Sequence, residues 1–210
     1  MRKLFWEDPY LKECTAKVES INGNEVRLSQ SVFFAFSGGQ ESDSGTIGGI
    51  PVKEARKEGN DITYVLESTP TFSPRSEVEV KIDAEKRMKI MRLHSAAHIV
   101  WFIFEKKTGI KKLIGSNVTS GKSRIDYEYP ESLSPILSEV EKEANELISR
   151  GAEIKTYPET GNPERRWWEL GEWKCPCGGT HPRDAKEIGQ IRLKRKNIGK
   201  GKERIEITLA

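Results

Sequence analysis

The first 82 residues alternate between short runs of β-branched or aromatic residues and clusters of turn-forming residues. The β-rich runs are Thr15–Ile21, Glu25–Gln30, Val32–Phe36, Ile62–Leu66 and Val78–Ile82. Glycine and asparagine separate them, at 22–24, 37–39, 48–49 and 58–60. Several short strands at such spacing predict a small antiparallel β-barrel in the N-terminal part of the chain.

From residue 84 the apolar period changes to that of a helix. Asp83 is a suitable N-cap for a helix over Ala84–Lys107, and Gly109 marks its end. Four apolar residues recur at helical spacing and are expected to face a core: Leu93, Ala97, Trp101 and Phe104. The pattern therefore predicts one long helix directly after the barrel.

A second helix and several strands complete the expected architecture. The helix is predicted to start at Ser134 with Pro135 in its first turn and to end at Gly151. Residues 161–180 are expected to be irregular. The expected strands are Leu113–Val118, Ser123–Tyr129, Ala152–Tyr157, Glu187–Lys194 and Glu203–Leu209. The prediction is an α+β protein with a β-barrel domain over 1–85 and, over 86–210, helices packed on an antiparallel sheet.

Composition indicates the class of protein and its expected cellular compartment. The 210 residues carry 35 Lys and Arg against 32 Asp and Glu, a net charge of +3, and only three cysteines. An odd number of cysteines does not form a disulfide framework. The N-terminus lacks the apolar run of a signal peptide, and no stretch approaches the roughly 20 apolar residues of a membrane span. We expect a cytoplasmic protein without membrane contact, a monomer or a weak homodimer.

The sharpest chemical feature is a pair of motifs with four-residue spacing. His94-Ser-Ala-Ala-His98 places two imidazoles on one helix face, and Cys177-Gly-Gly-Thr-His181 brings a thiol and an imidazole together across a glycine turn. These motifs use all three histidines of the chain. Three His and one Cys form a suitable tetrahedral set, so we predict one Zn²⁺ per chain. Cys175 is the competing thiol, for which a neighbouring, non-ligating position is favoured.

From these residues alone, a structural or RNA-binding zinc module and a hydrolase are equally good interpretations. Four protein ligands normally indicate a closed, structural zinc site. Ser95 occupies the position where a His-Glu-x-x-His peptidase has its glutamate, which argues against peptidase activity.

A glycine turn within the barrel region is the second informative feature. An aromatic run ends in Ser37-Gly38-Gly39-Gln40, followed by Asp43 and Gly45. The glycines permit close approach of a ligand or another segment, and the Gln40 amide can both donate and accept hydrogen bonds. An ordinary hairpin turn explains the same residues, and the pattern alone favours that simpler interpretation.

Together, in order, these motifs resemble the editing region of alanyl-tRNA synthetases and the free-standing alanyl-tRNA editing proteins of the AlaX type. The matching elements are Phe33-Phe34-Ala-Phe-Ser-Gly-Gly-Gln40 with Asp43 and Gly45, the His94/His98 pair, Gly115-Ser116, Cys177–His181 with Glu187-Ile-Gly189, and Lys202–Glu206. They cover almost the whole chain. Editing domains of threonyl-tRNA synthetases are similar at the His and Cys residues but generally lack the glycine-glycine-glutamine block. The family commonly has Thr-x-Phe-Tyr before the glycines, where this chain has Ser31, Phe33 and Phe34.

The resemblance implies a zinc-containing deacylase that cleaves the aminoacyl ester of mischarged tRNA(Ala), with serine or glycine as the wrong amino acid and no nucleotide cofactor. It implies catalytic roles for Gln40, His94 and His98, and metal binding by His94, His98, Cys177 and His181. A substrate pocket is expected from Ser31, Phe33, Gly38, Gly39 and Gln40. The alternatives are a non-catalytic, zinc-stabilised RNA-binding module and an enzyme that edits Ser-tRNA(Thr).

A basic cluster near the C-terminus is the expected RNA contact. Residues 192–204 contain seven basic residues and one acid, and such clusters neutralise phosphates. The predicted RNA-binding residues are Lys122, Arg124, Arg192, Lys194, Lys196, Lys200 and Lys202, with Arg165 and Arg166 as further candidates. Trp167, Trp168 and Trp173 are candidates for stacking a terminal base, although core packing is expected for at least two of them.

Overall fold

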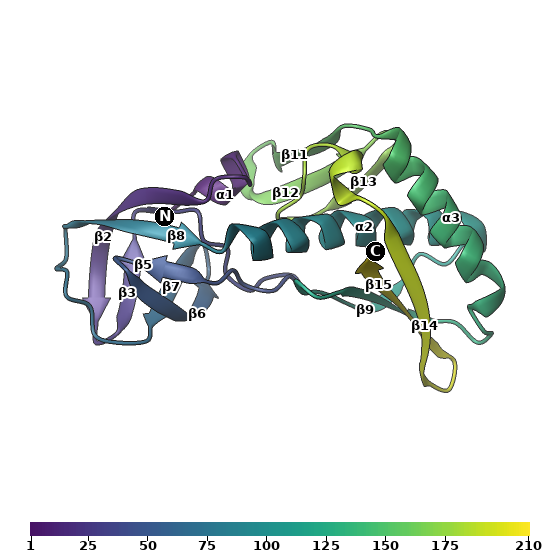
Figure 1. Ribbon diagram of the computed structural model, residues 1–210, viewed down its shortest axis with the longest axis horizontal. Coiled ribbons are helices and arrows are strands. Elements are labelled where there is room, and N and C mark those ends of the chain that lie inside the picture. The colour runs from purple at the N-terminus through teal and green to yellow at the C-terminus, as the bar shows by residue number, and fades with distance from the viewer. The chain divides into compact units, whose positions relative to one another are not determined.

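In the computed structural model, which describes all residues from 1 to 210, the chain divides into two units, Met1–Met88 and Lys89–Ala210. The division falls three residues after the boundary expected from the sequence (Figure 1). Each unit has its own core of buried apolar side chains.

The first unit is built around a closed ring of antiparallel strands. In ring order these are β2 (Glu13–Asn22), β3 (Glu25–Leu28), β7 (Asp61–Leu66), β6 (Ile50–Glu58), β5 (Gly45–Ile47) and β8 (Glu77–Ile82). β8 pairs back with β2, so no edge of the ring is left open. In β2, Ala16 and Val18 are buried and Lys17 between them is exposed, as the alternation of a strand requires.

Two short elements join the ring, and one expected strand is missing. β1 (Arg2–Lys3) pairs in parallel with β4 (Gln30–Ser31), and α1 (Leu4–Glu7) follows β1. The prediction of β-structure over Val32–Phe36 was wrong: these residues lie in no strand, although Val32 to Ala35 are buried. β5 and β6 were not predicted.

Two helices form the frame of the second unit. α2 (Ala84–Thr108) starts where Asp83 caps it, since the Lys86 amide donates to Asp83 Oδ1 at 3.0 Å. α3 (Ser134–Arg150) begins with Pro135 in its first turn and ends at Gly151, whose φ is 77°. The predicted starts and the glycine end are confirmed. α2 is buried on more sides than the predicted stripe, because Ile90, Ile99 and Ile103 are also inaccessible.

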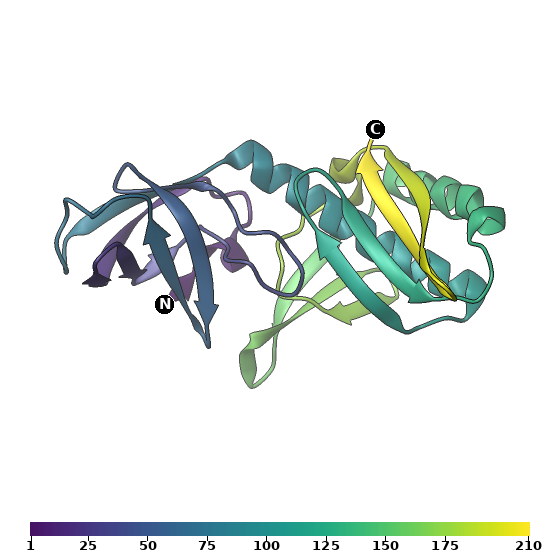
Figure 2. The same cartoon turned by 90° about the horizontal axis from the view of Figure 1, so that it is seen from below.

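Two antiparallel sheets cover α2. One has the order β14 (Ile191–Gly199), β15 (Lys202–Leu209), β10 (Ser123–Glu128) and β9 (Leu113–Val118); the other has β11 (Ile154–Glu159), β12 (Asn162–Leu170) and β13 (Trp173–Pro176). The ring of Phe104 on α2 packs against Tyr127 of the first sheet, and the ring of His98 packs against Trp168 of the second. Within this unit, Figure 1 shows α2 between the two sheets, and Figure 2 shows the first sheet in front of it.

The α+β class with antiparallel sheets is confirmed, and two local predictions were wrong. The segment 161–180, expected to be irregular, contains all of β12 and β13. The strand expected from Glu187 begins only at Ile191, because Ala185–Ile188 forms a short 3₁₀ helix that Asp184 and Glu187 close with a capping box. None of the helices is long and apolar enough to cross a membrane.

Candidate metal centre and the glycine turn

The second unit gathers three imidazoles and one thiol at a single point. One ligand atom from each of His94, His98, Cys177 and His181 lies within 4.8 Å of the others. Cys177 Sγ lies 3.5 Å from His94 Nε2 and 3.2 Å from His181 Nε2. All four predicted metal ligands are therefore brought together, and this cluster can hold a metal ion.

Local structure explains the convergence. His94 and His98 are one helical turn apart on α2, and their rings stack with centroids 4.9 Å apart. Cys177 follows β13 directly, where its amide donates to the Arg166 carbonyl at 2.8 Å and continues the strand pairing. The chain then turns through Gly178 and Gly179 and returns His181, which is buried, to the same point.

The outer nitrogens of two rings have defined neighbours. Ser95 Oγ lies 3.0 Å from His181 Nδ1, and Cys175 Sγ lies 3.6 Å from His98 Nδ1. Ser95 and Cys175 are both buried. In contrast, His98 Nε2 is buried and has no hydrogen-bond partner. Because His98 belongs to a group of four potential metal ligands, this nitrogen is free to bind a cation.

Burial sets the protonation of the cluster. It lowers the pKa of His94 to about 4, and the pKa values of His98 and His181 fall well below the ordinary value for the same reason, with neighbouring His charges adding to the effect. Burial raises the pKa of the Cys177 thiol to about 11. The imidazoles are thus neutral near pH 7, as metal ligation requires, and the thiol has to lose a proton to a bound cation.

The donor set fits zinc. Neutral imidazole nitrogens and a thiolate are the ligands that zinc prefers, in tetrahedral geometry. His98 Nε2, which has no hydrogen-bond partner, is available as one of the nitrogen ligands. Cys175 lies outside the group of four and contacts the ring of one member of it.

In the first unit, Gly38 and Gly39 form a two-residue hairpin turn. Their φ values are 59° and 83°, and Ser37 and Gln40 exchange two backbone hydrogen bonds of 3.3 and 3.0 Å. Left-handed backbone at both central positions explains the glycines. A Cβ at Gly38 would meet nothing within 4 Å, so space is not what limits that position. The Gln40 side chain is buried.

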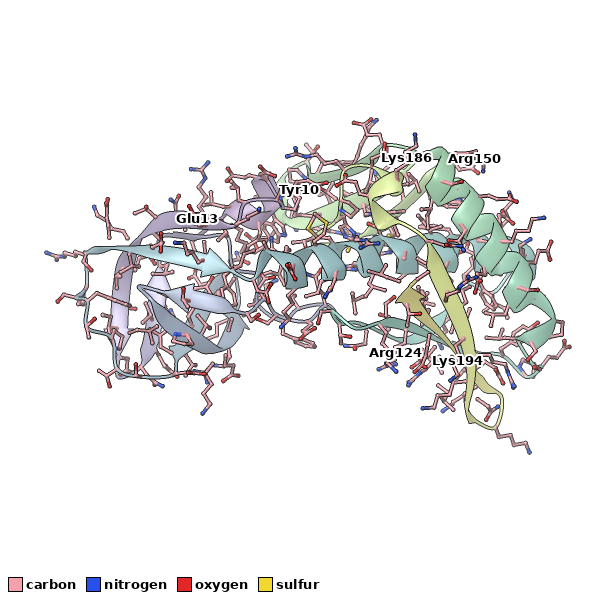
Figure 3. The ribbon with its side chains drawn as sticks, viewed as in Figure 1. Tyr10, Glu13, Arg124, Arg150, Lys186 and Lys194 are labelled. Carbon is pink, nitrogen blue, oxygen red and sulfur yellow. The ribbon has the colours of Figure 1, made fainter.

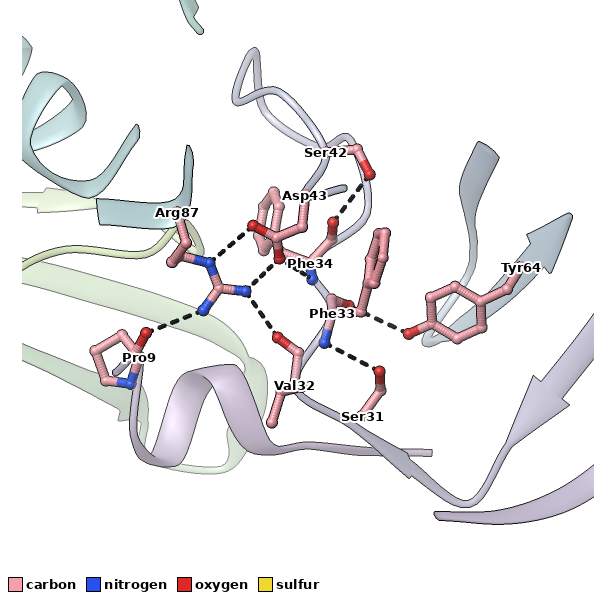
Figure 4. A network of polar contacts seen from close by, with 9 residues as sticks. All are labelled: Pro9, Ser31, Val32, Phe33, Phe34, Ser42, Asp43, Tyr64 and Arg87. Atoms are coloured by element: carbon pink, nitrogen blue, oxygen red, sulfur yellow. Dashed lines mark hydrogen bonds and ion pairs between the residues drawn. The ribbon is translucent and has the colours of Figure 1, made fainter. Parts of the chain in front are cut away.

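A buried ion pair holds the segment before this turn (Figure 4). Arg87 and Asp43 bond through Nε at 2.9 Å and again through Nη2, with side chains 3% and 1% exposed. Arg87 also donates to the carbonyls of Val32 and Pro9, at 2.7 and 3.0 Å. Asp43 accepts from the Phe34 amide at 2.7 Å. Arg87 was not singled out from the sequence, since no local pattern links it to the turn.

The predicted pocket residues Ser31 and Phe33 lie in the barrel interior. Neither is exposed. Ser31 Oγ accepts from the Phe33 amide at 3.0 Å, and the Tyr64 hydroxyl donates to the Phe33 carbonyl at 3.2 Å (Figure 4). Their roles in substrate binding, and the proximity of Gln40 to the histidine cluster, stay predictions.

Most of the predicted RNA-binding residues lie on one sheet of the second unit. Register pairs Lys194 with Glu206 and Glu206 with Arg124, so these side chains share a face. Figure 3 labels Arg124 and Lys194 on the same side of this unit. Four of the predicted RNA-binding residues are exposed lysines that form no ion pair: Lys194, Lys196, Lys200 and Lys202.

The other three predicted RNA-binding residues on or near this sheet form ion pairs with acids. Lys122 contacts Glu206 at 2.6 Å, Arg192 contacts Glu141 at 3.1 Å, and Arg124 pairs with Asp126. Arg204 adds two bonds to Asp126, at 2.7 and 2.9 Å. A Cβ at Gly115 would meet Asp126 Oδ2 at 3.0 Å, which explains the glycine there.

The three tryptophans differ in position. Trp168 is fully buried against His98, with ring centroids 4.7 Å apart, and Trp173 stacks on Phe102 at 5.4 Å. Trp167 is on the other face of β12 and lies between two cations, with Lys174 at 4.6 Å and Arg165 at 5.1 Å from its ring centroid. Core packing thus accounts for Trp168 and Trp173.

Comparison with known proteins gives consistent matches. The family described as "Threonyl and Alanyl tRNA synthetase second additional domain" matches residues 167–206. The chain is 38% identical to the alanyl-tRNA editing protein AlaX-M of Pyrococcus horikoshii, over 99% of this chain and 97% of the relative. It is 28% identical to the AlaX-M protein of Saccharolobus solfataricus, over 99% and 98%. It is also 31% identical to the alanine–tRNA ligase of Methanococcus aeolicus, of which it spans 25%.

Proposed function

Because the chain belongs to the AlaX-M family of alanyl-tRNA editing proteins, we propose that it is a trans-editing hydrolase that removes serine, and also glycine, from mischarged tRNA(Ala). The observation that carries the proposal is the cluster of His94, His98, Cys177 and His181 in a chain that aligns with an AlaX-M protein over its whole length. Water would add to the ester carbonyl, the bond to the ribose oxygen would break, and the free amino acid and the 3′-terminal hydroxyl would be released.

The four clustered side chains would hold Zn²⁺. When bound, the ion supplies a Lewis acid that either activates a water molecule or holds the substrate amino group in place. With four protein ligands available we favour orientation of the substrate, since an aminoacyl ester is already activated and positioning accounts for a large share of such a rate.

The glycine turn would form the wall of the substrate pocket. In this proposal Gln40, with Gly38 and Gly39, hydrogen-bonds the substrate or the attacking water, and Ser31 and Phe33 limit the pocket from behind. A site that hydrogen-bonds a hydroxyl rejects a substrate without one far better than a site that measures a methyl group. Serine would therefore be cleaved and alanine spared, whereas cleavage of glycine requires steric rejection of the alanine methyl.

The exposed lysines Lys194, Lys196, Lys200 and Lys202 would contact tRNA phosphates, with Lys122, Arg124 and Arg192 beside them. Such contacts position RNA without reading its sequence. Lys122, Arg124 and Arg192 are already engaged by acids, so we assign the larger electrostatic contribution to the four unpaired lysines.

A deacylation panel tests the proposal. Purified protein is mixed with Ser-, Gly- and Ala-tRNA(Ala) and with Ser-tRNA(Thr), and the loss of esterified amino acid is followed over time. We expect hydrolysis of the first two substrates only. Tight tRNA binding without hydrolysis would instead identify an RNA-binding module, and turnover that follows tRNA(Thr) would identify a threonine-specific editing enzyme. Equal hydrolysis of all substrates would overturn the editing function.

Two variants test whether the metal is needed for deacylation. His98→Ala removes a ligand, and we expect it to abolish zinc binding and deacylation together. Cys14→Ser changes a cysteine of the barrel that lies outside the cluster and is expected to leave both unchanged. Full turnover by a zinc-free His98→Ala protein would refute a catalytic metal.

A further inference from the structure

We propose that Cys175 and Ser95 are positioning residues of the metal centre, in which the Cys175 sulfur and the Ser95 hydroxyl accept the Nδ1–H groups of His98 and His181 and so fix the Nε2 lone pairs on the ion. The inference rests on the proposed zinc binding and not on the hydrolysis of a tRNA ester. It assigns a role to Cys175, the first cysteine of the Cys-Pro-Cys segment, which is not one of the four proposed metal ligands.

Geometry defines the two contacts. Cys175 Sγ lies 3.6 Å from His98 Nδ1, within hydrogen-bond range for sulfur, and Ser95 Oγ lies 3.0 Å from His181 Nδ1. In both pairs the neighbour faces Nδ1, which leaves Nε2 of each ring for the ion: His181 Nε2 is 3.2 Å from Cys177 Sγ, and His98 Nε2 is buried without a hydrogen-bond partner.

The tautomer follows from this division. A neutral imidazole carries one proton. If Cys175 donated its thiol proton to Nδ1, the proton of His98 would be on Nε2, where it would be buried without an acceptor and would block a metal. With Nδ1–H as the donor, the sulfur accepts and the partnerless Nε2 offers a lone pair. Histidine ligands of metals almost always donate their second N–H to an acceptor, most often a carboxylate, a backbone carbonyl or water, and here the sulfur takes that place.

The fold holds the two acceptors rigidly. Cys175 is paired with Trp168 in the β12–β13 ladder, and the Trp168 ring packs against the His98 ring with centroids 4.7 Å apart. The same strand pair therefore fixes His98 through its face and through its Nδ1. Ser95 is adjacent to His94 on α2, is fully buried and serves a ring from another part of the unit, that of His181. Neither acceptor can turn to water.

Zinc titration of the full-length chain, with a competing chelator and without tRNA, tests the proposal. We expect Cys175→Ala and Ser95→Ala each to weaken zinc binding by about 10- to 100-fold, while Cys175→Ser, which keeps an acceptor, recovers part of the loss. Cys14→Ser, a cysteine change in the barrel, is the matched control and should bind zinc like the parent. Affinity within twofold of the parent in both alanine variants would overturn the proposal.

Cobalt distinguishes an acceptor from a ligand. Co²⁺ in place of zinc gives a sulfur-to-metal absorption band whose intensity reports the number of bound thiolates. We expect Cys175→Ala to keep the band at saturating Co²⁺ and Cys177→Ser to lose it; loss of half the band in Cys175→Ala would make Cys175 a ligand and refute the inference.

Should either alanine variant fail to fold, ¹⁵N-histidine NMR of the zinc-loaded parent decides. Protons on Nδ1 of His98 and His181 support the proposal, and metal or no proton at those nitrogens refutes it. If the parent itself bound no zinc, the proposed metal would fail instead.

Discussion

Each unit contains a buried polar cluster, and the two clusters are satisfied in different ways. In the first, the Asp43 carboxylate and the Arg87 guanidinium neutralise each other, and the remaining Arg87 donors reach the carbonyls of Val32 and Pro9. In the second, the buried cluster consists of neutral imidazoles and a thiol, with no opposite charge, and His98 Nε2 has no partner. One arrangement is complete with protein atoms alone, and the other is not.

This difference distinguishes a buried polar network that stabilises the fold from one that can bind a ligand. A buried network whose members are all satisfied rigidifies the fold, whereas an unsatisfied one is costly unless something else completes it. The Asp43–Arg87 pair holds the segment before the glycine turn and needs no ligand to be satisfied. The histidine cluster needs a bound cation. The two units should therefore respond differently to zinc and to substitution.

The largest expected effect is a stabilisation by zinc that is confined to the second unit. Zinc at about 1,000 times its dissociation constant should stabilise this unit by about 4 kcal/mol. Hydrogen exchange measures it locally: amides of residues 94–104 and of β13 should gain protection, while those of the β2–β8 pair stay unchanged. Equal gains in both units would contradict the comparison, and His98→Ala, which removes a ligand, should cancel the gain.

The second effect is confined to the barrel. Arg87→Ala leaves Asp43 charged, buried and unpaired, and removal of one partner of such a pair costs about 3–5 kcal/mol. Denaturant unfolding of the variant should show this loss, and zinc affinity should not change. Arg56→Ala is the control, because its ion pair with Glu25 is 41% and 38% exposed and exposed pairs contribute about 1 kcal/mol or less. Similar losses in both variants would refute the assigned role of Arg87.

Local signals in the sequence predicted the helix ends and the metal ligands. Asp83 and Gly151 act through backbone geometry within a few residues of themselves, and the His and Cys spacings follow from one helical turn and one glycine turn. The apolar run Val32–Phe36 has the composition of a strand, but its backbone bonds to distant groups, among them Arg87 and Asp43.

What could not be predicted had no signal in the local pattern. β12 has Trp167 and Trp168 side by side, one on each face, without the clear alternation of a half-buried strand. The contact of Cys175 with His98 joins a strand and a helix through residues 77 positions apart. Such a contact depends on tertiary packing, which the local pattern does not contain.

The third effect, smaller than the first two, concerns the Glu203 carboxylate of the second unit. It is 2% exposed and accepts from Arg195 at 2.5 and 2.6 Å and from Asn197 at 2.9 Å. The Arg195 hydrogen bonds hold the pKa of Glu203 below its usual value. Glu203→Gln should lower the free energy of unfolding at pH 7 by about 2 kcal/mol, the range for hydrogen bonds to charged groups.

The pH dependence checks the cause. Because the folded pKa of Glu203 is the lower one, its stabilisation is fully present above the unfolded pKa near 4.5 and is lost as the pH falls through the folded pKa. The difference between parent and Glu203→Gln should therefore shrink below pH 4.5. Glu146→Gln, at an exposed helix pair with Lys142, should show almost no difference at any pH. A Glu203 effect independent of pH would exclude the ion pair as its source.

The smallest effect on stability is expected at the exposed lysines, which lie on the surface and not in either buried cluster. Lys194 and Lys196 are exposed and form no ion pair, so Lys194→Ala/Lys196→Ala should change the unfolding free energy by less than about 0.5 kcal/mol. If both contact tRNA phosphates, the slope of log affinity against log salt should fall by about 2, since each contact releases about one counterion. The control is Lys53→Ala/Lys57→Ala on β6 of the barrel. It tests whether the fall in slope is specific to lysines of the β14–β15 sheet or follows the removal of any two positive charges. An unchanged slope in the Lys194/Lys196 variant would show that these lysines do not contact the RNA. It would not bear on the metal centre, because exposed charges act electrostatically and additively, whereas the residues of the buried cluster act cooperatively.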